Sequence, residues 1–294
     1  MSKILVSGLV NIETTCSIGN FPINYQPIDY NFFGVNVNVA GVGFNITSAL
    51  TSLGDSVSLA SICGNDLPAK IIEAKLSELN VETHLQNTIV QTPTSVILYD
   101  NQGKRRIYCD LKDIQSKTYD ISSLSINDYD LVAACNINFN RKLLHIAKEN
   151  GITIATDVHV IGDVNDEYNK EFMECTDILF LSNEAVIGRE IDFIYQIKEK
   201  YNNKIIVMGC GSNGAIMYIR NYDKVIHQPA IIPSKIINTV GAGDALFSSF
   251  ISLYTKGIEP EKCLNLAQKF ASNKIGYNGA SIGFLSYEEL IGNN

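Results

Sequence analysis

The chain has 294 residues, of which 46% are hydrophobic and 18% charged, so it can bury the core of a large α/β domain and is not disordered. A net charge of -8 argues against nucleic acid or a membrane surface as a general partner, although backbone N–H groups and a metal can still hold an anionic ligand. The seven cysteines include no C-x-x-C pair, and no apolar run approaches the roughly 18 residues of a membrane span, which predicts a cytoplasmic protein with reduced thiols.

The first third of the chain predicts one central strand followed by segments of two different kinds. Residues 3–9 are continuously apolar, as expected of a buried parallel strand rather than a signal peptide. Residues 11–39 mix Asn, Tyr, Pro and Thr with apolar residues, which indicates short, partly exposed strands outside the main sheet. A helix at 41–53, a strand at 57–62 and an amphipathic helix at 67–79 follow.

Residues 94–109 predict a hairpin with its turn at 100–103, and with 11–39 this hairpin can build a small sheet that covers a site. From residue 130 strands and helices alternate, which implies a parallel sheet with helices on both faces. The strands are expected at 131–135, 153–157, 178–181 and 205–208, the helices at 141–149, 167–174 and 192–201, and a late hairpin at 215–219 and 224–228. No linker divides the chain, so we expect one domain over residues 1–294.

The most informative motif is Gly241-Ala242-Gly243-Asp244, which opens an apolar helix expected over 245–254. Free N–H groups at the positive end of a helix dipole can hold an anion. Asp244 is then placed to take a proton from a hydroxyl that attacks a bound phosphoryl group. The alternative is that Asp244 only caps the helix, and this motif alone leaves both interpretations open.

A second glycine cluster opens the helix at 41–53, where Gly41 and Gly43 let a ligand approach the backbone. Asn45 offers a donor and an acceptor to a hydroxyl-bearing molecule; the alternative is tight helix–strand packing with Asn45 as a cap. Asn11 and Glu13 follow the first strand, where ligands of open α/β sheets collect. Glu13 can bind a pair of hydroxyls or be a solvated loop acid.

Two later loops have a functional and a structural interpretation. The loop from Gly211 to Gly214 follows a strand and can lie against a nucleotide, although an ordinary turn is favoured. Asn183 and Glu184 can reach metal-bound water, although a cap of the following helix is favoured. The first strand is not followed by G-x-G-x-x-G, which argues against a Rossmann dehydrogenase.

Taken together, Asn11-x-Glu13, the helix opening near residue 40 and the motif at 241–244 resemble the PfkB carbohydrate kinases, the ribokinase-like sugar and nucleoside kinases, over essentially the whole chain. The resemblance implies a doubly wound, mostly parallel sheet flanked by helices, with a β-sheet lid made from about 11–39 and 94–109. It implies transfer of a phosphoryl group from ATP, with Mg²⁺, to a hydroxymethyl group of a sugar or nucleoside. It also implies that the lid can pair with a second subunit to form a homodimer.

The resemblance assigns roles to matching positions. Asp244 matches the catalytic base, and Gly241, Ala242 and Gly243 match the anion hole. The positions that match substrate contacts are Asn11, Glu13, Gly41, Val42, Gly43 and Asn45. Those that match contacts to ATP are Asn183, Gly211, Gly214 and Asn273, and Glu184 is expected to act on the metal through water.

Several positions depart from the family pattern. Val186 stands where the family's Asn-x-x-Glu motif has its acid, so the role toward Mg²⁺ passes to Glu184 or weakens. Asn238 replaces an Asp before the anion hole, which puts the family's monovalent-cation (K⁺) site in doubt. Glu13 replaces an Asp, and with Val186 it motivates an alternative function, a non-catalytic sugar or nucleoside sensor on the same fold.

The acceptor is only weakly indicated. Val42 and Asn238 favour a nucleoside such as pseudouridine over free ribose, and a fructose-type ketohexose is the other option. Neither glycine cluster carries a Lys or Arg, which disfavours phosphosugars. The basic residues at 104–106 lie beside a hairpin turn, where solvated side chains are expected.

Overall fold

A computed structural model of the protein describes residues 2–102 and 104–292, and within them nine strands form one large sheet in the order β13-β12-β11-β10-β9-β8-β1-β4-β5. All neighbours from β11 to β5 are parallel, and β12 and β13 complete one edge as an antiparallel hairpin. The strands are β1 (Lys3–Ser7), β4 (Ser56–Ile62), β5 (Glu82–Gln86), β8 (Leu131–Ala134), β9 (Thr153–Val160), β10 (Ile178–Ser182), β11 (Ile205–Gly209), β12 (Ala215–Ile219) and β13 (Lys224–Gln228).

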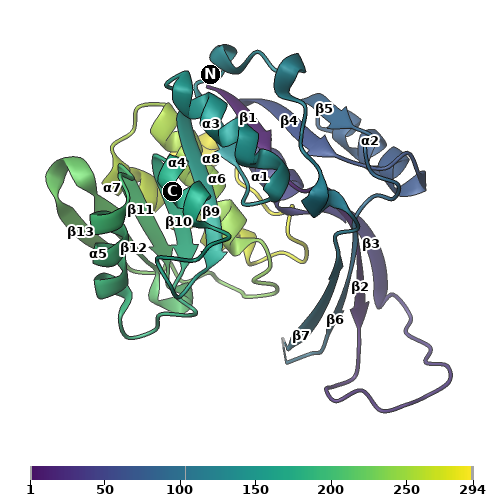
Figure 1. The fold of residues 1–294 in the computed structure, drawn as a ribbon. Coiled ribbons are helices and arrows are strands. Elements are labelled where there is room, and N and C mark those ends of the chain that lie inside the picture. Colours follow the sequence, from purple (N-terminus) through teal and green to yellow (C-terminus); the bar gives the residue numbers. More distant parts are fainter. Residues whose placement is uncertain (1, 103, 293–294) are drawn as a thin grey trace.

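Helices cover both faces of this sheet (Figure 1). One face carries α1 (Val42–Ser52), α2 (Leu67–Glu78), α6 (Ala242–Thr255), α7 (Pro260–Lys274) and α8 (Tyr287–Ile291), and the other carries α3 (Arg141–Glu149), α4 (Lys170–Cys175) and α5 (Glu190–Lys200). Along β1, Ile4 and Val6 enter the first core while Leu5 enters the second. Continuously apolar strands are needed because both faces are buried. The predicted doubly wound architecture is confirmed.

A second, four-stranded sheet forms the lid and projects away from the main sheet (Figure 1). Its order is β3-β2-β6-β7, from β2 (Asn11–Ser17), β3 (Val35–Ala40), β6 (Thr94–Tyr99) and β7 (Arg105–Asp110). These are the two segments predicted to stand apart, and β6 and β7 pair as the expected hairpin. Of the predicted turn, Gly103 lies outside the described residues.

Several helices and strands were not predicted from the sequence. The strand β5 is polar and pairs only with β4 at the sheet edge, so it lacks an apolar pattern. The helices α7 and α8 and the later part of β9, to Val160, were not predicted. Short 3₁₀ turns lie at Ile114–Ser116, Ile121–Ser123, Ile126–Asp128, Asn138–Asn140, Gly211–Asn213 and Arg220–Tyr222.

The cysteines lie mostly in the interior, as expected. Cys63, Cys135, Cys175, Cys210 and Cys263 are buried, and all seven cysteines are free thiols in the described chain. Over the same residues, every helix is too short or too polar to cross a bilayer.

Aromatic contacts fix α6 to the sheet. Phe180 of β10 meets Phe247 and Phe250 edge to face, with ring centroids 5.2 and 5.4 Å apart. We predict that Phe250→Ala lowers the free energy of unfolding by about 3–5 kcal/mol in urea titrations, because it leaves a cavity under α6. Phe32→Ala, at a side chain that is 82% exposed, is the matched control and should cost less than about 0.5 kcal/mol. Equal effects of the two substitutions would contradict this packing role.

Candidate active site

The turn that opens α6 requires glycine at its first position. Gly241 has a φ of 78°, and a Cβ there would lie 2.6 Å from the carbonyl oxygen of Ala280. No side chain in the described chain caps α6. Of the N–H groups in this turn, that of Ala242 donates to the carbonyl oxygen of Thr239 at 3.2 Å, and those of Gly241 and Gly243 remain available for an anion at the positive end of the helix dipole.

Asp244 does not cap the helix but meets the second glycine cluster directly. Its Oδ2 accepts a hydrogen bond of 2.7 Å from Nδ2 of Asn45, a residue 199 positions away. Asn45 is only 6% exposed and does not cap α1, whose N-cap is Gly41. The side-by-side packing of α1 and α6 thus joins two motifs that are remote in the sequence.

The electrostatic surroundings tune this carboxylate. Burial raises the pKa of Asp244, and the negative charge of Asp157 acts in the same direction. The hydrogen bond from Asn45 and the positive charges of His159 and Lys274 lower that pKa. Burial is the largest of these effects, so the pKa of Asp244 lies above its ordinary value, which suits this carboxylate to general-base catalysis.

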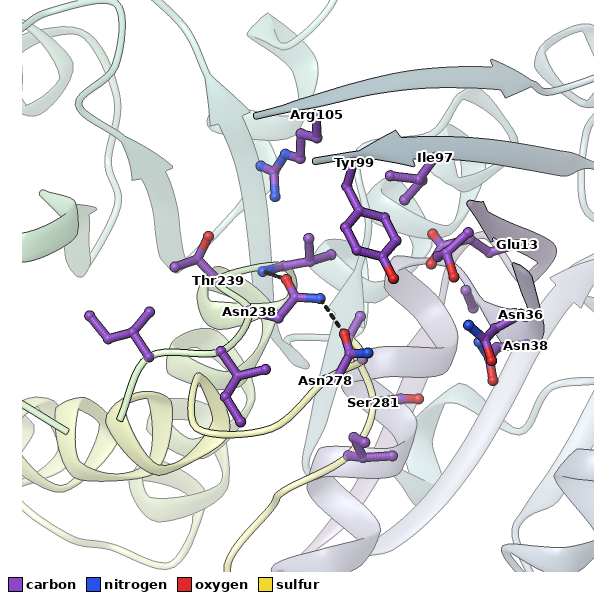
Figure 2. Close-up of a pocket in the computed structure, with 18 of the residues that line it drawn as sticks. Glu13, Asn36, Asn38, Ile97, Tyr99, Arg105, Asn238, Thr239, Asn278 and Ser281 are labelled. Atoms are coloured by element: carbon purple, nitrogen blue, oxygen red, sulfur yellow. Dashed lines mark hydrogen bonds between the residues drawn. The ribbon is translucent and has the colours of Figure 1, made fainter. Parts of the chain in front are cut away.

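A cavity of about 520 Å³ lies between the lid and the loops at 236–240 and 278–282 (Figure 2). The lid contributes Glu13 of β2, Asn36 and Asn38 of β3, Tyr99 of β6 and Arg105 of β7. A volume of this size with many polar side chains fits a small, hydroxyl-rich molecule. Burial raises the pKa of Glu13, so this acid is partly withdrawn from solvent.

The alternation of residues along the lid strands gives its two faces opposite character. Glu13 pairs with Asn38 on the cavity side. One position further along, Thr14 pairs with both Val37 and Val96, and Val96 pairs with Tyr108, in a row on the other face. The lid therefore turns a polar face toward the cavity and an apolar face outward.

In the described chain, the buried amides of Asn11 and Asn45 each lack a partner for one atom, as does that of Asn203 between α5 and β11. Nδ2 of Asn11 donates to Oγ of Ser95 at 3.1 Å, but Oδ1 of Asn11 and Oδ1 of Asn45 accept no hydrogen bond from any described residue. A buried acceptor left unpaired costs about 1–3 kcal/mol. Neither Asn11 nor Asn45 is among the residues that line the cavity, and a hydrogen bond from a ligand hydroxyl to either oxygen stays a prediction.

The glycines of the second cluster fit close backbone packing. A Cβ on Gly41, whose φ is 99°, would lie 2.5 Å from the carbonyl oxygen of Leu9. A Cβ on the buried Gly43 would lie 2.8 Å from the carbonyl carbon of Gly8. Val42 is half-buried beside them. The geometry explains the need for glycine at both positions by packing, and their contact with a ligand stays a prediction.

The predicted cap at Asn183 is wrong, because α5 begins only at Glu190. Instead Nδ2 of Asn183 donates to Oε1 of Glu190 at 3.0 Å, whereas Glu184 is exposed. Sequence reasoning missed Glu190, which lies beyond the family's motif spacing. An irregular turn separates Glu190 from Asn183, and no periodic pattern of apolar residues reveals that the two side chains meet.

The other positions predicted to contact a nucleotide lie near the carboxyl ends of the neighbouring strands, outside the cavity described above. Gly211 opens a turn after β11, and a Cβ on Gly214 would lie only 2.0 Å from the carbonyl oxygen of Gln228. The favoured interpretation of this loop as a turn into the β12–β13 hairpin therefore holds. Asn273, on α7, donates through Nδ2 to the carbonyl oxygen of Gly283 at 2.9 Å.

Two further features were missed. His159 at the end of β9 has a φ of 57°, and its N–H donates to Oδ1 of Asp157 at 2.8 Å. An acid and a histidine near the carboxyl end of an apolar strand are detectable in the sequence, because ligands collect at that edge of the sheet. Arg105 is exposed, as expected, and it also lines the cavity, which was not predicted (Figure 2). The period-2 alternation of β7 separates it from Arg106.

Comparisons with known proteins agree with this geometry. A family model described as pfkB family carbohydrate kinase matches residues 1–286. The chain is similar to a nucleoside kinase of Methanocaldococcus jannaschii (23% identical, covering 99% of this chain and 96% of the relative) and to a ribokinase of Dictyostelium discoideum (23%, 98% and 99%).

Solved structures give the same fold. A microbiome-derived acarbose kinase, Mak1, superimposes with a TM-score of 0.90 at 22% identity over 98% of this chain and 97% of that one. Arabidopsis thaliana ribokinase, complexed with ribose and ATP, gives 0.82 at 18% identity over 99% and 97%.

The contact between Asn45 and Asp244 can be tested by titration. Because that hydrogen bond stabilises the ionised form, Asn45→Ala should raise the pKa of Asp244 further, and an NMR titration of its carboxyl carbon measures the shift. Asn11→Ala leaves the contact intact and should not move that pKa. An unchanged or lower pKa of Asp244 in Asn45→Ala would show that Asn45 does not stabilise the carboxylate.

Proposed function

Because the chain belongs to the pfkB family of carbohydrate kinases, and is thus a phosphotransferase with an alcohol acceptor, we propose that it transfers the γ-phosphoryl group of ATP to a hydroxymethyl group of a sugar or nucleoside. The observation that carries this proposal is the hydrogen bond between Asn45 and Asp244 at the uncapped start of α6. Residues 1–294 act as a single ribokinase-like kinase domain. The use of ATP supports a cytoplasmic location.

The reaction follows from the geometry of the turn. Asp244 takes the proton of the acceptor hydroxyl, and the oxygen attacks the γ-phosphorus in line with the leaving oxygen of ADP. The N–H groups of Gly241, Ala242 and Gly243, with the dipole of α6, stabilise the negative charge that develops on the transferred group.

The donor set suits a Mg²⁺ ion that is held mainly by phosphate oxygens and water. Among the described residues, no group of three or more His, Cys, Asp or Glu side chains is arranged to hold a metal. Asn183 with Glu190, and the exposed Glu184, supply oxygen atoms for an outer shell of water. When bound, Mg²⁺ neutralises charge on the phosphates.

The nucleotide is assigned to the carboxyl ends of β10 and β11, with Asn183, Gly211 and Gly214 on one side and Asn273 on the other. Ligands of open α/β sheets bind at this edge. The relative from Arabidopsis thaliana was solved with ribose and ATP, which supports ATP as the donor.

The acceptor is assigned to the cavity under the lid. The unpaired Oδ1 atoms of Asn11 and Asn45 and the carboxylate of Glu13 can accept hydroxyl protons, and Tyr99 offers a flat apolar surface to a sugar ring or base. Val42 supports a nucleoside such as pseudouridine, and ribose- and fructose-type sugars are the other candidates. The similarity to a nucleoside kinase and to ribokinases supports this range.

The lid also supports a homodimer. Val37, Val96 and Tyr108 form an apolar row on its outer face, with exposures of 60%, 40% and 48%. A β-sheet face of this kind gains free energy when a second sheet covers it. We propose that the lid of a second subunit covers it.

The central role of Asp244 predicts a specific loss. With Mg-ATP, the protein should release ADP in the presence of one acceptor from a panel of ribose, fructose, pseudouridine, uridine and adenosine. Asp244→Asn should lower kcat by roughly 10²–10⁴-fold while the acceptor still binds in calorimetry. A kcat near that of the unaltered protein would contradict the assignment of Asp244 as the catalytic base. Thermal stabilisation by a panel compound without ADP release would favour the sensor.

Arg105 is the one cationic side chain lining the cavity in the described chain. We predict that Arg105→Ala lowers kcat/KM by about 10-fold or more, because a charge-assisted hydrogen bond to bound substrate is lost. Arg106→Ala is the matched control: Arg106 stacks on Tyr108, 4.9 Å from the ring centroid. Steady-state kinetics of both variants decide the matter, and equal kcat/KM values would refute the role of Arg105.

The proposed dimer predicts a change in mass. Val96→Lys places a charge on the outer face of the lid and should shift the protein from dimer to monomer in light scattering coupled to gel filtration. Val90→Lys, at a valine that is 84% exposed outside the lid, should leave the dimer intact. A monomeric unaltered protein, or a dimer insensitive to Val96→Lys, would rule out the lid interface.

A further inference from the structure

Lys274, the last residue of α7, is a fully buried cation beside the anion hole. None of its surface is exposed, and its Nζ donates to the carbonyl oxygens of Val240 and, at 3.4 Å, of Asn238. Both carbonyls belong to the loop that leads into Gly241. A lysine is almost never fully buried unless its charge is paired, so this position needs a physical explanation.

The loop is built so that its carbonyl groups meet the ammonium group. The N–H groups of Ile237 and Asn238 both donate to the carbonyl oxygen of Ile275, at 2.8 and 3.1 Å. Oδ1 of Asn238 accepts from the N–H of Val240 at 2.9 Å, and its Nδ2 donates to Oδ1 of Asn278 at 3.2 Å (Figure 2). These bonds fix the turn and leave the carbonyl oxygens of Asn238 and Val240 for a positive charge.

The charge balance agrees with this geometry. Burial lowers the pKa of Lys274 to about 8, and the negative charge of Asp244 acts in the opposite direction. The ammonium group is thus retained near neutral pH by carbonyl oxygens and by the carboxylate that it helps to keep ionised.

The loop at 238–241 is also the place of the family's monovalent-cation site, which the replacement of Asp by Asn238 put in doubt. The residues present do not fit such an ion, because the carbonyl oxygens of Asn238 and Val240 already accept hydrogen bonds from Lys274. An added cation there would face the positive charge of the ammonium group at close range. A neutral amide at position 238 fits this arrangement, because the positive charge of Lys274 is already balanced by the carboxylate of Asp244.

We propose that the ammonium group of Lys274 takes the place of a monovalent cation and holds the loop before the anion hole, so that phosphoryl transfer needs no K⁺. Lys274 is then a positioning residue: it acts through the backbone of residues 238–241 and touches neither substrate. This inference rests on the proposed function, since it concerns the anion hole of that reaction.

Kinetics in different salts provide the first test. At equal ionic strength, the unaltered protein should have the same kcat in potassium, sodium and tetramethylammonium chloride. Lys274→Ala should lose about 10- to 100-fold in kcat in tetramethylammonium, with a smaller change in KM, and should regain activity in potassium. Lys274→Met fills the space and should lose activity without regaining it.

Lys269→Met is the matched control. Lys269 lies on the same helix and also donates to backbone carbonyls, those of Glu289 and Leu290, away from the anion hole. It should show no new dependence on potassium. Activation of the unaltered protein by potassium of 10-fold or more would overturn the proposal.

A second readout does not depend on activity. Crystals of the unaltered protein soaked in rubidium chloride should show no anomalous peak beside the carbonyl oxygens of Asn238 and Val240. Crystals of Lys274→Ala should show one. A rubidium peak there in the unaltered protein would overturn the proposal even if Lys274→Ala did not fold. This result does not depend on whether an acceptor has been found. A failure of the kinase assignment can therefore be distinguished from a failure of the proposal for Lys274.

Discussion

The structure depends on one interaction, the hydrogen bond between Asn45 and Asp244. Asp244 lies at the start of α6, where the helix dipole favours negative charge, and the hydrogen bond from Asn45 opposes the rise in pKa that burial causes. That bond exists only if α1 and α6 pack on the same face of the sheet with their first turns at the same edge. The glycine turn, the aromatic packing under α6 and the buried charge of Lys274 all serve to fix that arrangement.

The lid differs from the main sheet in what covers its two faces. The main sheet is buried on both faces, whereas the lid turns polar side chains inward and apolar ones outward. Its inner face can therefore replace water around a hydroxyl-rich acceptor, and its outer face is suited to another protein surface. Few lid side chains enter either core of the main sheet, so the lid is held mainly by its own strand pairing.

Most of the fold could be predicted from the sequence, because apolar runs and turn residues mark buried strands and helices. The predicted bounds of α3, β12 and β13 agree with the structure. The polar edge strand β5 lacks an apolar pattern and was missed, whereas α7 was missed although its amphipathic pattern is as marked as that of α5. For the site, glycine clusters pointed to two helix openings. The contact of Asn45 with Asp244, the burial of Lys274 and the pairing of Asn183 with Glu190 arise from tertiary packing, which no local pattern encodes.

The most direct test of the central claim is a crystal structure with an acceptor and a non-hydrolysable ATP analogue. We expect the acceptor's hydroxymethyl oxygen at roughly 2.6–3.2 Å from a carboxylate oxygen of Asp244, with the terminal phosphate at the N–H groups of Gly241–Gly243. An acceptor whose hydroxyls all lie away from Asp244, or a terminal phosphate bound elsewhere, would contradict it.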